Sequence, residues 1–233
     1  MNIVQNYKFR YKITSFSSYS FSGLHGFDIQ YDQFSVTYYT ITYYLSKIFM
    51  FDENWEFKTV SSNIAKPVFI KPVGNELFIA AENGVYKTDK DVNILASYTS
   101  SGAGYRGIFY LKATDHVVVA NTASNRIEIF YRNLTYITNI PIPTMPYSFG
   151  EYEGNMFVGT STGQIIVINN NYQIIKTYIT GCTSYILSFI IDPEGYLLYF
   201  CDSNFGVYLY HTNGTDMGKP IKTATSSENI RID

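Results

Sequence analysis

Few side chains in this sequence are of the types that could do chemistry. The three histidines, His25, His116 and His211, lie far apart along the chain, and no Gly-rich phosphate loop, GxSxG elbow or HExxH motif is present. Serine and threonine are abundant, but no Ser/His/Asp set can be identified, because spatial convergence cannot be read from spacing. We therefore predict that the protein is not an enzyme and uses no cofactor.

The elements that would have to position such residues repeat along the chain. Residues 117–137, VVVANTASNRIEIFYRNLTYI, contain three hydrophobic runs separated by a polar knot and an Asn-Leu break. This punctuation is typical of consecutive antiparallel strands joined by short turns. A unit of roughly 40 residues with four such strands recurs, and five complete units fit into residues 18–224. The turn after the first strand is marked in three units by Val73-Gly74-Asn75, Glu153-Gly154-Asn155 and Pro193-Glu194-Gly195.

These repeats predict an all-β fold. A four-stranded sheet cannot cover its own faces, but several such sheets can when they stack radially around a channel. We predict a single domain over residues 1–233, a six-bladed β-propeller of four-stranded antiparallel blades. Residues 2–15 align with third and fourth strands and residues 227–233 with a first strand, so the two termini would share the closing blade. Because its second strand is missing, we expect either a three-stranded closing blade or a boundary within a longer protein.

The pattern RGI…VVVANTASNRIEIF in residues 106–130 resembles the repeat of NHL-type propellers. The resemblance covers nearly the whole chain and is strongest in the units starting near Gly104 and Ser184. The NHL family includes adaptors, RNA binders, enzymes and surface proteins. The resemblance therefore implies the fold and leaves the function open.

The same resemblance raises one alternative from another functional class, a metal-dependent hydrolase or lyase with its site in the central channel. Some NHL-like propellers are lyases that hold zinc through channel histidines, but the three histidines here do not converge on our alignment of the units. A calcium-dependent lactonase-like hydrolase would instead gather carboxylates at the channel mouth. The residues of first strands that could face the channel are Asp28, Glu151, Glu228 and Arg231. We expect ordinary hydration of these side chains and no metal site.

Propellers tend to act through the loops at one mouth, because the blades supply a rigid frame. Here that face combines the segments leading into first strands with the knots between second and third strands, and it is rich in aromatics and amides. We predict a non-enzymatic module that binds a protein or peptide there, since Tyr and Arg are enriched at binding hot spots. A glycan is a second alternative, because sugar rings stack on aromatic faces. The predicted binding residues are Tyr105, Arg106, Tyr147, His25, Tyr43, Tyr44, Asn125 and Asn204.

Charge and hydropathy exclude two classes of partner. The formal net charge is −2 and only 15% of residues are charged, so no basic field exists to attract a phosphate backbone, and we predict no nucleic-acid binding. No run approaches the ~18 apolar residues needed to span a bilayer, so we predict no membrane insertion. We expect a monomer.

The cysteines and two sequons bear on the compartment. Cys182 precedes the first strand of its unit and Cys201 ends the second, so a disulfide is geometrically reasonable between these antiparallel neighbours; two buried reduced thiols are the alternative. Asn133-Leu134-Thr135 and Asn213-Gly214-Thr215 match the glycosylation acceptor pattern, although Asn and Gly also suit the turns in which they lie. If the chain is a domain of a longer protein, these features favour an extracellular setting. The lack of an apolar segment behind the early charges favours the opposite, so the compartment stays open.

Overall fold

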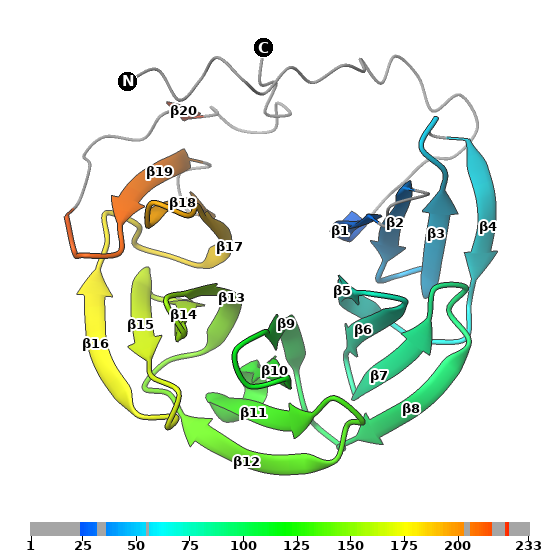
Figure 1. The fold of residues 1–233 in the computed structure, drawn as a ribbon, viewed down its shortest axis with the longest axis horizontal. Helices are drawn as coiled ribbons and strands as arrows, with labels where there is room; N and C mark the ends of the chain where they lie inside the picture. Colours follow the sequence, from blue (N-terminus) through cyan, green and yellow to red (C-terminus); the bar gives the residue numbers. More distant parts are fainter. Residues whose placement is uncertain (1–23, 32–35, 55, 203–205, 216–221, 224–233) are drawn as a thin grey trace.

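Five antiparallel sheets stand around a common axis (Figure 1). The structure is a computed structural model, and it describes residues 24–31, 36–54, 56–202, 206–215 and 222–223. Each sheet contains four strands that are hydrogen-bonded in chain order. The β-propeller predicted from the repeats is confirmed, and its five blades correspond to the five complete units.

The strands of each blade follow one another as a meander from the axis to the rim. In the first blade they are β1 (Leu24–Tyr31), β2 (Val36–Thr42), β3 (Lys47–Phe51) and β4 (Phe57–Ser61). The second blade holds β5 (Pro67–Val73), β6 (Glu76–Ala81), β7 (Gly84–Asp89) and β8 (Ile94–Thr99). In the third are β9 (Tyr105–Leu111), β10 (His116–Asn121), β11 (Arg126–Tyr131) and β12 (Tyr136–Pro141). The fourth comprises β13 (Pro146–Tyr152), β14 (Asn155–Thr160), β15 (Gln164–Ile168) and β16 (Ile174–Ile179). The fifth comprises β17 (Ile186–Ile191), β18 (Tyr196–Cys201), β19 (Gly206–His211) and β20 (Lys222–Thr223).

The described blades cover most of the circle around the axis. The first strands lie innermost, and each packs beside the next, from β1 through β5, β9 and β13 to β17 (Figure 1). Between the fifth blade and the first, the figure shows a sector that no described residue occupies. The predicted closing blade rests on residues 2–15 and 227–233, which lie outside the described residues. The structure therefore shows five blades, and the six-bladed prediction is not confirmed.

The burial of each strand depends on whether neighbouring blades cover its two faces. Middle strands lie between two neighbouring blades, and all four residues from Val117 to Ala120 in β10 are fully buried. Rim strands meet water, and five of the six residues of β16 are exposed. The turns expected at Gly74 and Gly154 are confirmed; both glycines have positive φ, +58° and +75°, a conformation that costs glycine little. The described residues contain one short helix, η2 (Thr122–Ser124), and no helix there is long and apolar enough to cross a membrane.

The core lies between blades rather than within them. One apolar cluster joins the first and second blades through Ile41 and Ile79, and further clusters join each following pair of blades in turn. The inner strands approach closely: a Cβ built at Gly107 of β9 would lie 2.0 Å from the main-chain oxygen of Tyr147 in β13. Only glycine fits there without moving backbone, so Gly107 sets the distance between two first strands.

Candidate functional site

The first strand of every blade carries a β-bulge at its second residue. In the fourth blade Pro146 pairs with Thr160 and Ser148 with Gly159, so Tyr147 has no partner of its own, and the first, second and fifth blades repeat this irregularity. In the third blade Arg106 and Gly107 together lie opposite Ala120. A bulge re-aims a side chain and is common at rims and beside functional sites. Because the inner strands surround the axis, the five bulges lie at one mouth of the channel (Figure 1). The residues at the bulge position are His25, Val68, Arg106, Tyr147 and Leu187.

Arg106 is the cation of this ring. Its guanidinium carbon lies 6.0 Å from the centroid of the Tyr43 ring, which comes from the turn after β2 in the first blade. The side chain is partly exposed, and no described carboxylate oxygen lies within 4.0 Å of its nitrogens. Among the residues that the structure describes, Arg106 is therefore held by an aromatic face rather than by an ion pair, and it presents its positive charge at the mouth.

A second cation nearby is compensated. Lys66 Nζ lies 2.5 Å from Glu82 Oε2, and the Tyr43 hydroxyl donates to Glu82 Oε1 at 2.7 Å. The hydrogen bond from Lys66, followed by that from Tyr43, lowers the pKa of Glu82, while its partner Glu82 raises the pKa of Lys66. The hydrogen bond to Glu82 also raises the pKa of Tyr43, which therefore stays protonated as the donor. Glu82 thus neutralises Lys66 and orients the Tyr43 ring toward its neighbours.

Tyr147 continues the same surface into the fourth and fifth blades. Its ring centroid lies 4.8 Å from that of Tyr185, with the planes tilted by 60°. Desolvation is the main cause that raises the pKa of Tyr147, the charge of Tyr185 adds to it, and the nearby Arg106 opposes it. Arg106 therefore lies near Tyr43 on one side and Tyr147 on the other. We call this arc across five blades the mouth cluster: Tyr43, Lys66, Glu82, Arg106, Tyr147 and Tyr185.

The burial of Tyr105 contradicts its prediction as a binding residue. Its side chain is 0% exposed, and its hydroxyl donates to Glu128 Oε2 at 2.6 Å, so it cannot contact a ligand. The carboxylate of Glu128 is equally buried and also accepts from Asn121 Nδ2 at 2.9 Å and Arg126 Nη2 at 2.6 Å. Because strand residues alternate between faces, Tyr105 turns into the blade while Arg106, displaced by the bulge, turns to the mouth.

The remaining predicted binding residues have separate placements. Tyr44 is 77% exposed beside the mouth cluster, with its ring 5.2 Å from that of Tyr43 in an edge-on arrangement. Asn125 is exposed and ends η2 in the left-handed conformation, with φ 47°. Its backbone N–H donates to the main-chain oxygen of Thr122, so its role in the structure is to terminate this turn. His25 lies at the bulge of β1, where only the backbone is described, and Asn204 lies outside the described residues.

The described side chains that were considered as metal ligands do not come together in one site. His116 Nδ1 contacts the hydroxyl of Tyr172, and His211 Nδ1 accepts from the N–H of Asn213 at 3.1 Å. Glu151 accepts from the N–H groups of Lys112 and Ala113 at 3.0 and 3.2 Å, so it links two blades. Over the described ranges, no group of three or more His, Cys, Asp or Glu side chains could hold an ion. The side chain of Asp28, and the residues Glu228 and Arg231, lie outside what the structure describes.

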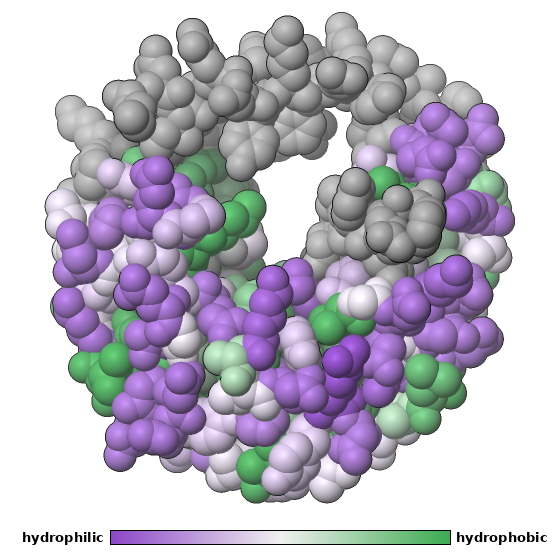
Figure 2. All heavy atoms as spheres, viewed as in Figure 1, coloured by the Kyte–Doolittle hydropathy of each residue, from purple (hydrophilic) through white to green (hydrophobic). Residues whose placement is uncertain are grey.

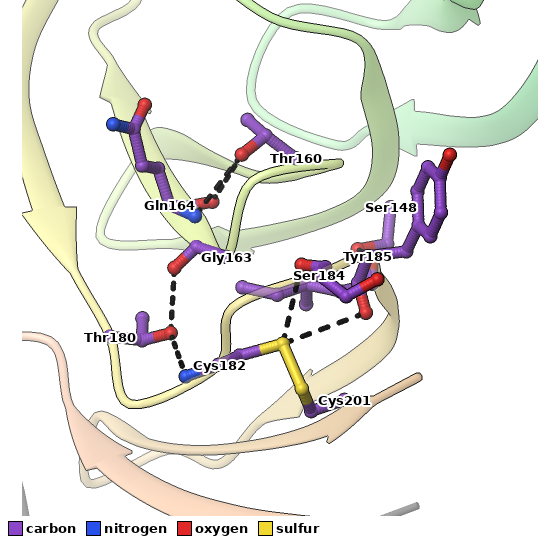
Figure 3. Close-up of a disulfide and its surroundings, with 10 residues drawn as sticks. Ser148, Thr160, Gly163, Gln164, Thr180, Cys182, Ser184, Tyr185 and Cys201 are labelled. Carbon is purple, nitrogen blue, oxygen red and sulfur yellow. Dashed lines mark hydrogen bonds between the residues drawn. A yellow bond between two sulfur atoms is a disulfide. The ribbon is translucent and has the colours of Figure 1, made fainter. Parts of the chain in front are cut away.

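Of the two alternatives that the sequence left open for Cys182 and Cys201, the structure shows the disulfide (Figure 3). Cys182 and Cys201 are joined at an S–S distance of 2.06 Å with their Cα atoms 5.7 Å apart, and both side chains are buried. Cys182 Sγ lies 3.3 Å from the Ser184 oxygen and 3.8 Å from the Tyr185 oxygen. The bridge therefore holds the short segment that carries Tyr185 to the mouth.

Lys66, Glu82 and Tyr185 were missed among the sequence-based candidates. All three stand next to the ends of strands that the repeats predict, since Lys66 precedes β5, Glu82 follows β6 and Tyr185 precedes β17. Superposing the five units and marking the positions beside each first and second strand would have identified them. Their mutual contacts could not be predicted, because they depend on the rotation from one blade to the next.

Comparison with known proteins supports the fold alone. No protein-family model matches the sequence, and a search of curated proteins finds no match. The fold is shared with many solved structures. One of them is described as "Streptogramin B lyase structure"; it matches with a TM-score of 0.71 and 15% identity over 85% of this chain and 68% of the other. At this identity the likeness is one of architecture.

Proposed function

We propose that this protein is a non-enzymatic, NHL-like propeller that binds a protein or peptide through the mouth cluster. The observation that carries the proposal is the position of Arg106, a partly exposed cation with no ion pair among the described residues, between Tyr43 and Tyr147. Arginine and tyrosine offer large contact area together with hydrogen bonds and a low ordering cost. Lys66 is paired with Glu82, so Arg106 is the cation of the mouth cluster that forms no ion pair with a described residue. A peptide carboxylate beside an apolar or aromatic side chain fits this pattern.

The test selects peptides from a phage-displayed random library on the immobilised protein and then measures their affinity by calorimetry. We expect enrichment of acidic or carboxyl-terminal sequences, and a loss of at least about tenfold in affinity for Arg106→Ala and for Tyr147→Ala, which is about 1.4 kcal/mol. The matched control is Arg132→Ala, in the turn after β11 at the other end of the same blade, where Glu76 binds the guanidinium at 2.9 Å. Unchanged affinity in Arg106→Ala, or equal loss in Arg132→Ala, would remove the assignment.

The six-bladed closure belongs to the same proposal. Ile190 of β17 and Leu198 of β18 are paired neighbours that are 75% and 41% exposed. Leu197 and Tyr199 point the other way, into the cluster shared with the fourth blade. The fifth blade thus exposes apolar side chains on the face turned away from the fourth blade, and Figure 2 shows hydrophobic side chains of this region beside the central opening. We infer that residues 2–15 and 227–233 cover this face as a closing blade, which removes an exposed sheet face.

Hydrogen exchange tests the closure on the full chain. Amides in residues 2–15 and 227–233 should exchange slowly, as strand amides do. Removal of residues 227–233 should then release the protection of residues 2–15, since the two segments would share one sheet. Exchange at the rate of an unstructured peptide in either segment would contradict the closing blade.

Two alternatives remain open to test. The first is a metal-dependent hydrolase or lyase with its site in the central channel, and the streptogramin B lyase structure is described as that of a lyase. Metal analysis of the purified protein decides it, because stoichiometric zinc or calcium would replace our preference. A glycan-binding module is favoured by the adjacent rings of Tyr147 and Tyr185, on which a sugar could stack. Binding on a glycan array that is lost in Tyr185→Ala would identify it. We propose that the protein acts as a monomer, does not bind nucleic acid and does not insert into membranes.

A further inference from the structure

The two sequons lie in equivalent turns of the third and fifth blades. Each turn joins the third strand to the fourth, and each asparagine is exposed. The side-chain oxygen Oδ1 of Asn133 accepts from the N–H of Thr135 at 2.9 Å, and Oδ1 of Asn213 accepts from the N–H of Thr215 at 2.9 Å. With Oδ1 engaged, the amide nitrogen Nδ2 is the atom of each side chain left to face water. Neither Nδ2 donates a hydrogen bond to any residue that the structure describes.

The other three blades close the same turn in a different way. There the first turn residue, Asp52, Asp89 or Asn169, accepts from the N–H groups two and four residues later. Amide nitrogens in these turns are used: Asn93 donates to Asp89 at 2.8 Å, and Asn169 donates to Gln173 at 3.2 Å. In the sequon turns the first residue is Tyr131 or His211, so the closing oxygen has moved to the sequon asparagine. Counting the described residues only, the side chains of Asn133 and Asn213 are thus hydrogen-bonded through their oxygen alone.

The Cys182–Cys201 disulfide supplies an independent observation. Disulfides persist in oxidising compartments, which are also where N-linked glycans are added. The location of the turns is compatible with the mouth cluster as well. Turns between third and fourth strands lie at the opposite end of each blade from the start of the first strand, so a glycan there leaves Arg106 accessible.

We propose that Asn133 and Asn213 are N-glycosylation sites. The donor class is an oligosaccharide linked to a lipid diphosphate, used by a transferase of the secretory route. The asparagine Nδ2 forms a bond to the anomeric carbon, the bond from that carbon to the diphosphate oxygen breaks, Nδ2 loses one proton to the transferase, and the lipid diphosphate leaves. No electron transfer is involved. The threonine two residues later completes the acceptor pattern.

The experiment uses the full chain, secreted from insect cells behind an added, cleavable signal peptide. Peptide N-glycosidase digestion in heavy-oxygen water converts each formerly glycosylated asparagine to labelled aspartate, which mass spectrometry locates. We expect label at Asn133 and at Asn213 in most molecules. A secreted, disulfide-bonded chain without label at either position would overturn the proposal, and label at one position alone would remove the other turn from it.

Variants of the two sequons distinguish the loss of a glycosylation site from a loss of folding. Asn133→Asp and Asn213→Asp keep the turn-closing oxygen but lack the amide nitrogen, so each should lose one glycan and remain folded. Thr135→Ser should keep its glycan. In the fourth blade Gln173→Thr creates a sequon at the exposed Asn171, in a turn already closed by Asn169. We expect lower occupancy at Asn171 than at the natural sites, and equal occupancy would overturn the role of the moved oxygen.

Discussion

Replacing Tyr105 by phenylalanine tests the interpretation of this residue as a structural group. The change deletes one hydroxyl that is fully buried and donates to Glu128 Oε2 at 2.6 Å. Asn121 and Arg126 bind the other carboxylate oxygen, so Oε2 would lose the one donor that the described residues show for it. A hydrogen bond to a buried charged group contributes about 1.5–3 kcal/mol, more than a neutral one. We therefore expect Tyr105→Phe to lower the free energy of unfolding by about 2 kcal/mol.

The assay is equilibrium urea unfolding with the disulfide intact, where a lower midpoint at an unchanged slope reports stability alone. The matched control is Tyr136→Phe, since Tyr136 is 39% exposed and its hydroxyl accepts from Asn139 Nδ2 at 2.7 Å. A surface change of this kind should stay within about 0.5 kcal/mol. A loss below 0.5 kcal/mol in Tyr105→Phe would refute the reasoning. So would a loss of peptide affinity without a loss of stability, because it would restore Tyr105 to the binding site.

Three further predictions concern the frame. Gly107→Ala places a Cβ against the main-chain oxygen of Tyr147 in β13 and should lower the free energy of urea unfolding by about 1–3 kcal/mol. The control Gly181→Ala should lower it little, because the atom nearest to the new Cβ would be 3.8 Å away. Equal losses in the two variants would contradict the close approach of the inner strands. The double variant Cys182→Ala/Cys201→Ala removes a bridge between residues separated by 19 positions in the sequence. The freed loop gains entropy in the unfolded chain, so the free energy of unfolding should fall by about 3 kcal/mol. Thermal unfolding measures this, and an unchanged melting temperature would refute it. Burial raises the pKa of Tyr39 above its ordinary value of 10.0, so the unfolded chain loses this proton at a lower pH than the folded chain. The free energy of unfolding should therefore fall above about pH 10, by up to ~1.4 kcal/mol per pH unit. Urea unfolding of Tyr39→Phe tests the cause: a smaller fall confirms it, and an identical fall excludes it.

The sequence alone determined the blades. Hydrophobic runs of strand length and Gly-marked turns recur at a fixed period, and these are local signals that each blade carries in full, so the five meanders and the reversals at Gly74 and Gly154 could be predicted. The Cys182–Cys201 pair could be predicted for the same reason, because it joins adjacent strands of one blade.

The site depended on more than one blade. Alternation along β9 does not reveal the bulge that turns Arg106 to the mouth and leaves Tyr105 buried on Glu128. Nor does any local pattern bring Tyr43 of the first blade within 6.0 Å of Arg106 in the third, because that distance is set by the rotation between blades. The sequence determined which residues lie near the ends of strands. Only the packing of blade against blade decided which of them are buried, which are exposed and which meet at the mouth, since those properties arise from contacts between units that are distant in the chain.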